Sequence, residues 1–149
     1  MLLIEKINDD LKNAMKNQEK EKLSVIRMLK GSIQLAKTEL KRDLTDEEVI
    51  DIITKQVKMR NESIKEFDKA GRSDLKNQYQ SEVDILNTYL PEQLSREEVM
   101  SIIDEVFADI QPSSMKQMGM IIKEVSPKVK GRFEMSEVSK IVKKKLENM

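Results

Sequence analysis

Apolar residues recur every three or four positions along most of the chain, a spacing that places them on one face of an α-helix. The first run, from Leu3 to Met15, predicts an amphipathic helix over residues 2–17, and a second run predicts a long helix over 23–40. The polar run KNQEKEK between them predicts a turn or a kink. No stretch shows sustained apolar–polar alternation, so the pattern contains no strand signal.

Helix starts are indicated by residues that can cap the first turn. Four hydroxyl residues stand where such a cap is expected: Thr45, Ser95, Ser114 and Ser136. After the first three, a Glu or Gln follows three residues later, which predicts a capping box. The boxes at Thr45 and Ser95 also place further carboxylates in the first turn, where the helix dipole favours them.

Two residues mark helix ends. Gly71 is suited to a left-handed stop of the third helix, and Pro91 disfavours helix at the residue before it. The pattern therefore predicts an all-α fold, with about four longer helices in an N-terminal subdomain, 1–90. A C-terminal subdomain, 91–149, is expected to hold three shorter helices. Gly31 falls inside the second helix, where we expect it to allow close helix packing.

The amino-acid composition limits the kinds of catalytic and metal site that the chain can form. The chain contains no Cys and no His, which excludes disulfides and thiolate nucleophiles and removes the commonest general base and zinc ligand. Paired carboxylates lie mainly in helix first turns, where capping explains them. We therefore expect no catalytic residues, no metal site and no cofactor. Without a signal peptide or an apolar run of membrane length, the expected location is cytoplasmic, with no membrane partner.

Charge is unevenly distributed although the chain is neutral overall. Residues 91–110 carry a net charge of −5, and residues 111–149 carry +5. A polyanionic partner is therefore sought at the basic C-terminal part.

The basic part contains a candidate phosphate-binding surface. Its seven cations are Lys123, Lys128, Lys130, Arg132, Lys143, Lys144 and Lys145. Gly119 and Gly131 stand near the two ends of MGMIIKEVSPKVKGR and mark a backbone bend there. Phosphate contacts would give salt-sensitive affinity without sequence preference. The alternative is a solvated face whose lysine stems cover apolar surface.

Four stretches resemble one known family, the YqeY-like proteins: INDDLKNAMKNQEKEKLSVIRMLKGSIQ, GRSDLKNQYQSEVDIL, YLPEQLSREE and MGMIIKEVSPKVKGR. The resemblance covers essentially the whole chain. This family is similar to the C-terminal tail domain of GatB, a subunit of the glutamine-dependent amidotransferase that converts misacylated Glu-tRNA or Asp-tRNA. The resemblance implies an all-helical fold with an N-terminal multi-helix part and a C-terminal three-helix part.

The resemblance also implies a connection to tRNA. In GatB the catalytic, ATP and metal sites lie in a preceding cradle domain, which this sequence does not contain, and the tail domain contributes tRNA binding. The positions carried over are Gly119, Lys123, Lys128, Lys130, Gly131 and Arg132. The sequence departs from the family pattern after KVKGR, where FEM replaces a small or acidic stretch. A second glycine is also replaced, around Ile122 and Lys123.

The leading hypothesis is a non-catalytic accessory protein that binds tRNA or associates with a tRNA-dependent amidotransferase or synthetase complex. No DNA partner is expected. One alternative is a helical protein-interaction adaptor without RNA binding, which would expose an apolar stripe on a helix of residues 19–70. A third is carbon–nitrogen ligase activity with glutamine as amido donor, which rests on family analogy alone.

Overall fold

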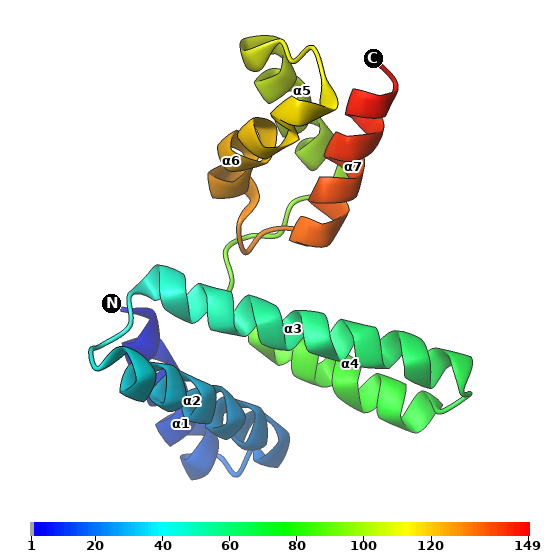
Figure 1. Ribbon diagram of the computed structural model, residues 1–149. Helices are drawn as coiled ribbons and strands as arrows, with labels where there is room; N and C mark the ends of the chain where they lie inside the picture. Colours follow the sequence, from blue (N-terminus) through cyan, green and yellow to red (C-terminus); the bar gives the residue numbers. More distant parts are fainter. Residues whose placement is uncertain (1) are drawn as a thin grey trace. The chain divides into compact units, whose positions relative to one another are not determined.

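The computed structural model describes residues 2–149, which form seven α-helices and one short 3₁₀ helix (Figure 1). These residues contain no strand, so the all-α fold expected from the periodicity is confirmed. The chain divides into two compact units, an N-terminal unit that ends at Leu90 and a C-terminal unit, Pro91–Met149. Each unit encloses its own apolar core.

The N-terminal unit contains four helices: α1 (Leu3–Lys16), α2 (Lys20–Leu40), α3 (Asp46–Lys69) and α4 (Ser73–Asn87). The helices α3 and α4 form a hairpin, α1 packs on α2, and α2 packs on both arms of the hairpin. Ten side chains form the buried core: Ile7, Ala14, Val25, Ile26, Leu29, Ile33, Val49, Ile53, Leu86 and Tyr89. Most of them belong to the periodic apolar runs, so these runs form the packed faces of the helices.

One buried ion pair lies where this core ends along the hairpin. Arg60 of α3 is only 7% exposed, and its Nε lies 3.1 Å from Oε1 of Glu82 on α4. The far end of the hairpin extends past α1 and α2 (Figure 1). There its two helices contact each other through an edge-on pair of rings, Phe67 and Tyr79, with centroids 5.1 Å apart.

The end of α3 follows the sequence prediction. Gly71 has φ 69°, and its N–H donates to the carbonyl of Asp68 at 3.2 Å. The N–H of Arg72 donates to the carbonyl of Phe67 at 2.9 Å. These two bonds define a Schellman motif, which satisfies carbonyls that the helix leaves unpaired.

The predicted capping box at the start of α3 is also present. The backbone N–H of Glu48 donates to the Thr45 hydroxyl, and the Glu48 carboxylate accepts the N–H of Thr45 at 3.0 Å. Arg42 donates to the same carboxylate at 2.7 Å. The Arg42 hydrogen bond, together with that of Thr45, lowers the pKa of Glu48 to about 2. The Glu48 carboxylate therefore has a structural role, in capping the start of α3.

The C-terminal unit contains α5 (Arg96–Ile110), the 3₁₀ helix η1 (Met115–Gln117), α6 (Met118–Val129) and α7 (Met135–Glu147). The helix α6 packs on both α5 and α7, and η1 packs on α7. The buried core consists of ten side chains: Leu94, Val99, Ile103, Val106, Ile121, Val125, Val129, Val138, Val142 and Leu146. The capping box of Ser95 begins α5 as predicted.

Two predicted capping interactions in this unit are wrong. Ser114 is the N-cap of the 3₁₀ turn that precedes α6, but its side chain makes no capping bond. The side-chain amide oxygen of Gln117 instead accepts the N–H of Ser113. The helix α7 begins at Met135 with Glu134 as its N-cap, two residues before the Ser136 cap that we expected. Packing accounts for the earlier start, because residues beside that start are partly buried against the core.

Candidate nucleic-acid interface

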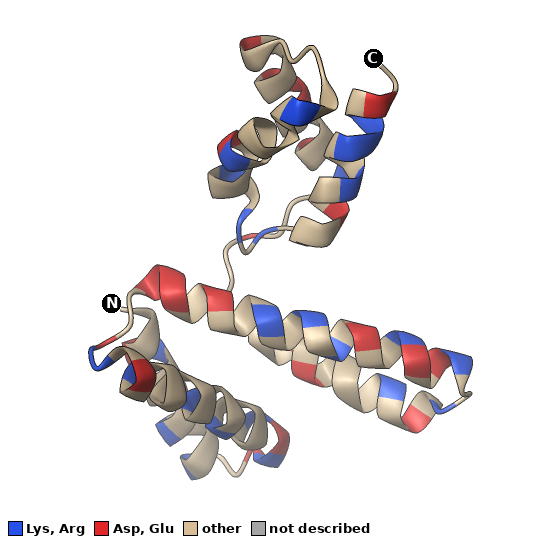
Figure 2. Cartoon of the chain, in the orientation of Figure 1, with Lys and Arg blue, Asp and Glu red and all other residues tan. Residues whose placement is uncertain are grey.

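The seven predicted cations lie on two helices and the turn between them (Figure 2). Lys123 and Lys128 are on α6, Lys130 and Arg132 are in the turn, and Lys143, Lys144 and Lys145 are on α7. The contacts that each side chain already makes separate them into structural and exposed cations.

Arg132 fastens the α6–α7 turn to the segment that precedes α5. Its Nε donates to the carbonyl of Glu92 at 3.0 Å, and its own carbonyl accepts the N–H of Leu94 at 2.8 Å. Beside it, the Gln93 side-chain amide donates to the carbonyl of Gly131 at 2.8 Å. Arg132 therefore has a structural role, which leaves fewer of its donors for a phosphate.

The two glycines differ in conformation. Lys130, with φ −58° and ψ 126°, and Gly131, with φ 71°, occupy the centre of a type II turn. The N–H of Arg132 closes that turn on the carbonyl of Val129 at 2.9 Å. Gly119 is the second residue of α6 and does not have a positive φ, so the bend expected there is wrong. Lys130 is half-buried within the turn.

Lys145 is paired with a carboxylate of α5. Its ammonium forms an ion pair with Asp104 of α5 and lies 5.0 Å from the centroid of the Phe107 ring. A cation that contacts a carboxylate and an aromatic face in this way is partly neutralised before any ligand arrives. Lys145 therefore contributes little to a phosphate-binding surface.

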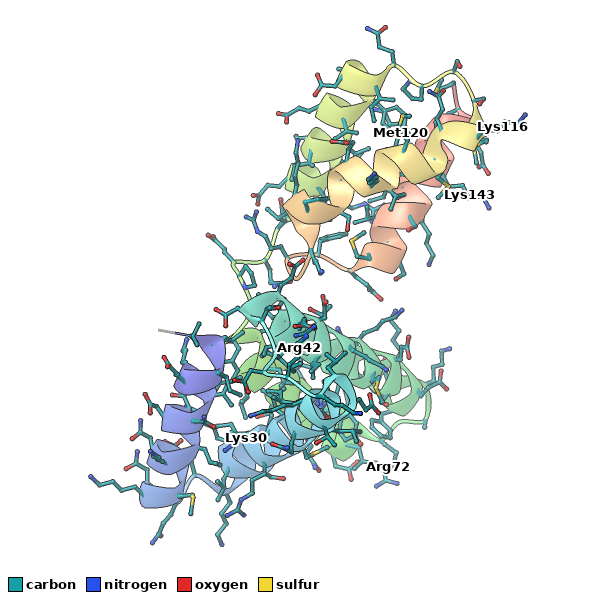
Figure 3. All side chains as sticks on the ribbon, turned by 60° about the vertical axis from the view of Figure 1, so that its left-hand side comes forward. Lys30, Arg42, Arg72, Lys116, Met120 and Lys143 are labelled. Carbon is teal, nitrogen blue, oxygen red and sulfur yellow. The ribbon has the colours of Figure 1, made fainter. Side chains whose placement is uncertain are left out.

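The remaining predicted lysines are exposed. Within residues 2–149, no side-chain hydrogen bond or ion pair engages four of them: Lys123, Lys128, Lys143 and Lys144. A fifth exposed lysine, Lys116 on η1, shares this state and was missed by the sequence interpretation. Figure 3 shows it on the same side of the unit as Lys143, as expected from the packing of η1 on α7. The order of the helices along the sequence could not reveal that Lys116 and Lys143 lie on the same side.

Carboxylates neutralise only part of the basic surface. Glu137 lies 3.7 Å from Arg96 and 3.4 Å from Lys140, so these two cations share one anion. Together with the pair between Lys145 and Asp104, these contacts are confined to the side where α7 faces α5. The lysines of η1 and α6 lie outside this pairing.

Aromatic rings are not presented beside these lysines. Phe133, the ring next to Arg132 in the sequence, packs partly buried against the core of the unit. Phe107 lies beneath the ammonium of Lys145. Contacts to nucleic acid would therefore go to phosphates, since base stacking requires an accessible ring.

The carboxylates do not gather into a metal-binding group. Among residues 2–149, no three His, Cys, Asp or Glu side chains are placed to hold an ion together. Over the same residues, no helix is both long and apolar enough to span a bilayer.

Three curated proteins are similar to this chain. One is "Altered inheritance of mitochondria protein 41, mitochondrial" of Pyrenophora tritici-repentis, 29% identical over 138 residues, which cover 91% of this chain and 76% of the relative. An uncharacterized protein of Schizosaccharomyces pombe is 32% identical over 89 residues, covering 60% and 72%. A protein of Candida glabrata with the same name as the first is 35% identical over 88 residues, covering 58% and 48%.

These names contradict the expected cytoplasmic location. Two of the relatives are named as mitochondrial proteins. The expectation rested on the lack of a signal peptide and of an apolar span, and neither feature distinguishes the cytosol from the interior of an organelle. The expected cytoplasmic location is therefore wrong.

The family resemblance is confirmed by a direct match. The family model described as Yqey-like protein matches residues 4–146, which include all helices of the N-terminal unit except the first residue of α1. The match also includes α5, η1, α6 and α7 up to Leu146. The chain therefore belongs to the YqeY-like protein family.

Proposed function

We propose that this protein binds structured RNA, specifically transfer RNA, through the exposed lysines of η1, α6 and α7. The carrying observation is that five lysines are exposed without a side-chain partner among the described residues: Lys116, Lys123, Lys128, Lys143 and Lys144. The similarity of the family to the tRNA-binding tail domain of GatB supports transfer RNA as the ligand.

The chemistry of the surface favours recognition of backbone and shape. Lysine ammonium groups offer three donors each on flexible stems, which suits contacts to phosphates at varied positions. Without an accessible ring, the surface cannot stack unpaired bases. Double-stranded RNA is recognised largely through such phosphate and shape contacts.

In this role the protein is an accessory factor and performs no ligase step. The similarity to a tail domain suggests that it acts beside a tRNA-dependent amidotransferase or synthetase complex. The chain is electrically neutral overall, so long-range attraction is weak and the local lysines must supply the affinity.

The test is a titration of labelled transfer RNA at low and at moderate salt. The variant Lys123→Glu/Lys128→Glu reverses the charge of two exposed side chains. Arg132 is left unchanged, because a substitution there would also break its hydrogen bond to the carbonyl of Glu92. Losing two phosphate contacts should lower the salt slope of the logarithmic affinity by about 2. The matched control is Lys12→Glu/Lys20→Glu, which makes the same charge change at exposed positions of the N-terminal unit.

Three results would refute the proposal. One is an absence of binding at low salt, and another is equal affinity in the wild type and Lys123→Glu/Lys128→Glu. The third is an equal loss of affinity in the control Lys12→Glu/Lys20→Glu, which would assign the binding to total charge instead of this surface.

The adaptor hypothesis requires an apolar stripe on residues 19–70. Four large apolar side chains are exposed there: Met28, Leu35, Leu40 and Met59. Met28 and Leu35 share a face of α2, but Ser32 lies between them on that face and its hydroxyl accepts the Gln56 amide at 2.8 Å. Ser32 thus interrupts the apolar face between Met28 and Leu35, and the pocket that Met28 and Met59 line together is otherwise lined by polar side chains and Tyr79. This surface therefore does not carry a second candidate function.

A further inference from the structure

A groove between α5 and α7 has a composition that RNA binding does not explain. It encloses about 440 Å³, and its apolar lining comes from Met100 and Ile103 of α5 and Ile141 of α7. Met100 is 45% exposed, whereas Ile103, three residues further along α5, is fully buried. Apolar surface left open between two helices is unfavourable in water, so a ligand that covers it would gain free energy.

Charged side chains line the edges of this groove with an excess of cations. The cations are Arg96, Lys140, Lys144 and Lys145, and the anions are Asp104 and Glu137. Three of the cations already pair with these two anions. Lys144 has no side-chain partner among the described residues. A ligand with acidic groups along its edges therefore complements the groove.

The length of the groove matches a short helix. Its lining extends along α7 from Glu137 to Asn148, which corresponds to about 16 Å at the helical rise. A partner helix of about three turns would cover this length and present an apolar residue every third or fourth position.

We propose that the α5–α7 groove binds an acidic amphipathic α-helix of a partner protein. The apolar face of that helix covers Met100 and Ile141, and its carboxylates contact Lys144 and the neighbouring cations. A nucleic-acid backbone has no apolar face to cover Met100, and a basic helix would be repelled by the excess of cations. The thioether of Met100 can adapt to different apolar partners.

The probe is a synthetic 15-residue helical peptide (a length of about four turns) with leucines on one face and glutamates on its flanks. The matched peptide carries lysines in place of the glutamates. Fluorescence anisotropy with the full-length chain should show binding of the acidic peptide and at least roughly tenfold weaker binding of the basic one. Sedimentation of the chain with and without peptide tests whether a second copy occupies the groove.

Two variants test whether the peptide binds in the groove. Met100→Glu adds a repulsive carboxylate at an exposed position and should weaken acidic-peptide binding roughly tenfold. Lys144→Glu, also at an exposed position, should weaken it severalfold. The control Met120→Glu, on α6, alters another methionine that is 55% exposed (Figure 3) and should leave binding unchanged.

Several outcomes overturn this inference: no binding of the acidic peptide, equal binding of both peptides, or equal losses in Met100→Glu and Met120→Glu. A dimer of the chain that the peptide dissociates would assign the groove to a second copy. Loss of transfer-RNA affinity in Met100→Glu as large as its loss of peptide affinity would assign the groove to RNA.

Discussion

At the scale of single residues, the neighbours of a charge decide its role. Arg132 and Lys123 come from one basic stretch, yet Arg132 holds the backbone of Glu92 and Lys123 is exposed. Lys143 and Lys145 are two residues apart on α7, and only Lys145 reaches Asp104. Residue type alone could not separate these pairs, because the partners lie up to 41 positions away in the sequence.

The buried pair of Arg60 and Glu82 should be sensitive to the loss of one partner. Replacing Glu82 with Leu leaves the Arg60 guanidinium buried without its carboxylate, and we expect the free energy of unfolding to fall by about 3 kcal/mol. The double variant Arg60→Met/Glu82→Leu should recover most of this loss, because no unpaired charge remains. Urea denaturation of the wild type and both variants measures these differences in the free energy of unfolding.

The control for this pair is an exposed one on the same hairpin. Lys76 lies 2.9 Å from Asp68, with side chains 42% and 66% exposed. Lys76→Met should change the free energy of unfolding by less than about 1 kcal/mol. A Glu82→Leu variant as stable as Lys76→Met would contradict a structural role for the buried pair.

Tyr89 should make stability depend on alkaline pH. Its hydroxyl donates to Asp10 at 2.6 Å, and burial, reinforced by Asp10, raises its pKa in the folded state. Its contribution is complete below the unfolded pKa of about 10 and falls as pH rises toward the folded pKa. Tyr89→Phe should therefore cost about 1–2 kcal/mol at pH 8.

The wild type and Tyr89→Phe are compared by urea denaturation at pH 8 and at alkaline pH. The difference between them should shrink above a pH of about 10. A difference that stays constant over this range would show that Tyr89 does not remain protonated in the folded state.

At the scale of the helices, local signals succeed where the interaction itself is local. The capping boxes at Thr45 and Ser95 were predicted because each involves residues only three positions apart. The start of α7 was mispredicted because packing of Phe133 and Met135 against the core of the unit outweighs the Ser136 signal. Gly31 was expected at a close helix contact, yet no atom lies within 4 Å of a Cβ added there.

The glycines allow a matched prediction about helical and left-handed backbone conformations. Gly119→Ala places a methyl group in open space within α6 and should raise the free energy of unfolding by about 0.5–1 kcal/mol. Gly71→Ala also meets no atom within 4 Å, but φ is 69° there, so it should lower stability by about 1 kcal/mol. Thermal unfolding of both variants shows whether each substitution raises or lowers the stability.

This comparison isolates backbone conformation, since neither methyl group meets a neighbour. A third variant, Gly31→Ala, should follow Gly119→Ala because it lies inside α2. If all three substitutions had the same sign, the backbone at Gly71 would not be the cause of the difference.

At the scale of the whole molecule, each unit has a core drawn from its own helices. The core of the C-terminal unit consists of residues between Leu94 and Leu146, and its turn is hydrogen-bonded to its own first residues through Arg132 and Gln93. We therefore expect the fragment 91–149 to fold alone, with marginal stability because it is short.

Circular dichroism of this fragment during urea titration measures the expected helicity and one cooperative transition. If the RNA proposal is correct, the folded fragment should retain salt-dependent binding of transfer RNA. Helicity without a cooperative transition would show that its core requires the N-terminal unit.

The all-helical fold and several helix boundaries follow from the amino-acid sequence alone, because apolar spacing and capping act within about four residues. The family follows from the sequence as well, through the matching stretches along the chain. The sequence also located the basic part of the chain. The three-dimensional packing was needed to show which cations stay exposed, that Lys116 lies on the side of Lys143, and that Arg60 is buried against Glu82. These features join residues far apart in the sequence, and their energies depend on burial and distance, which a linear pattern does not encode.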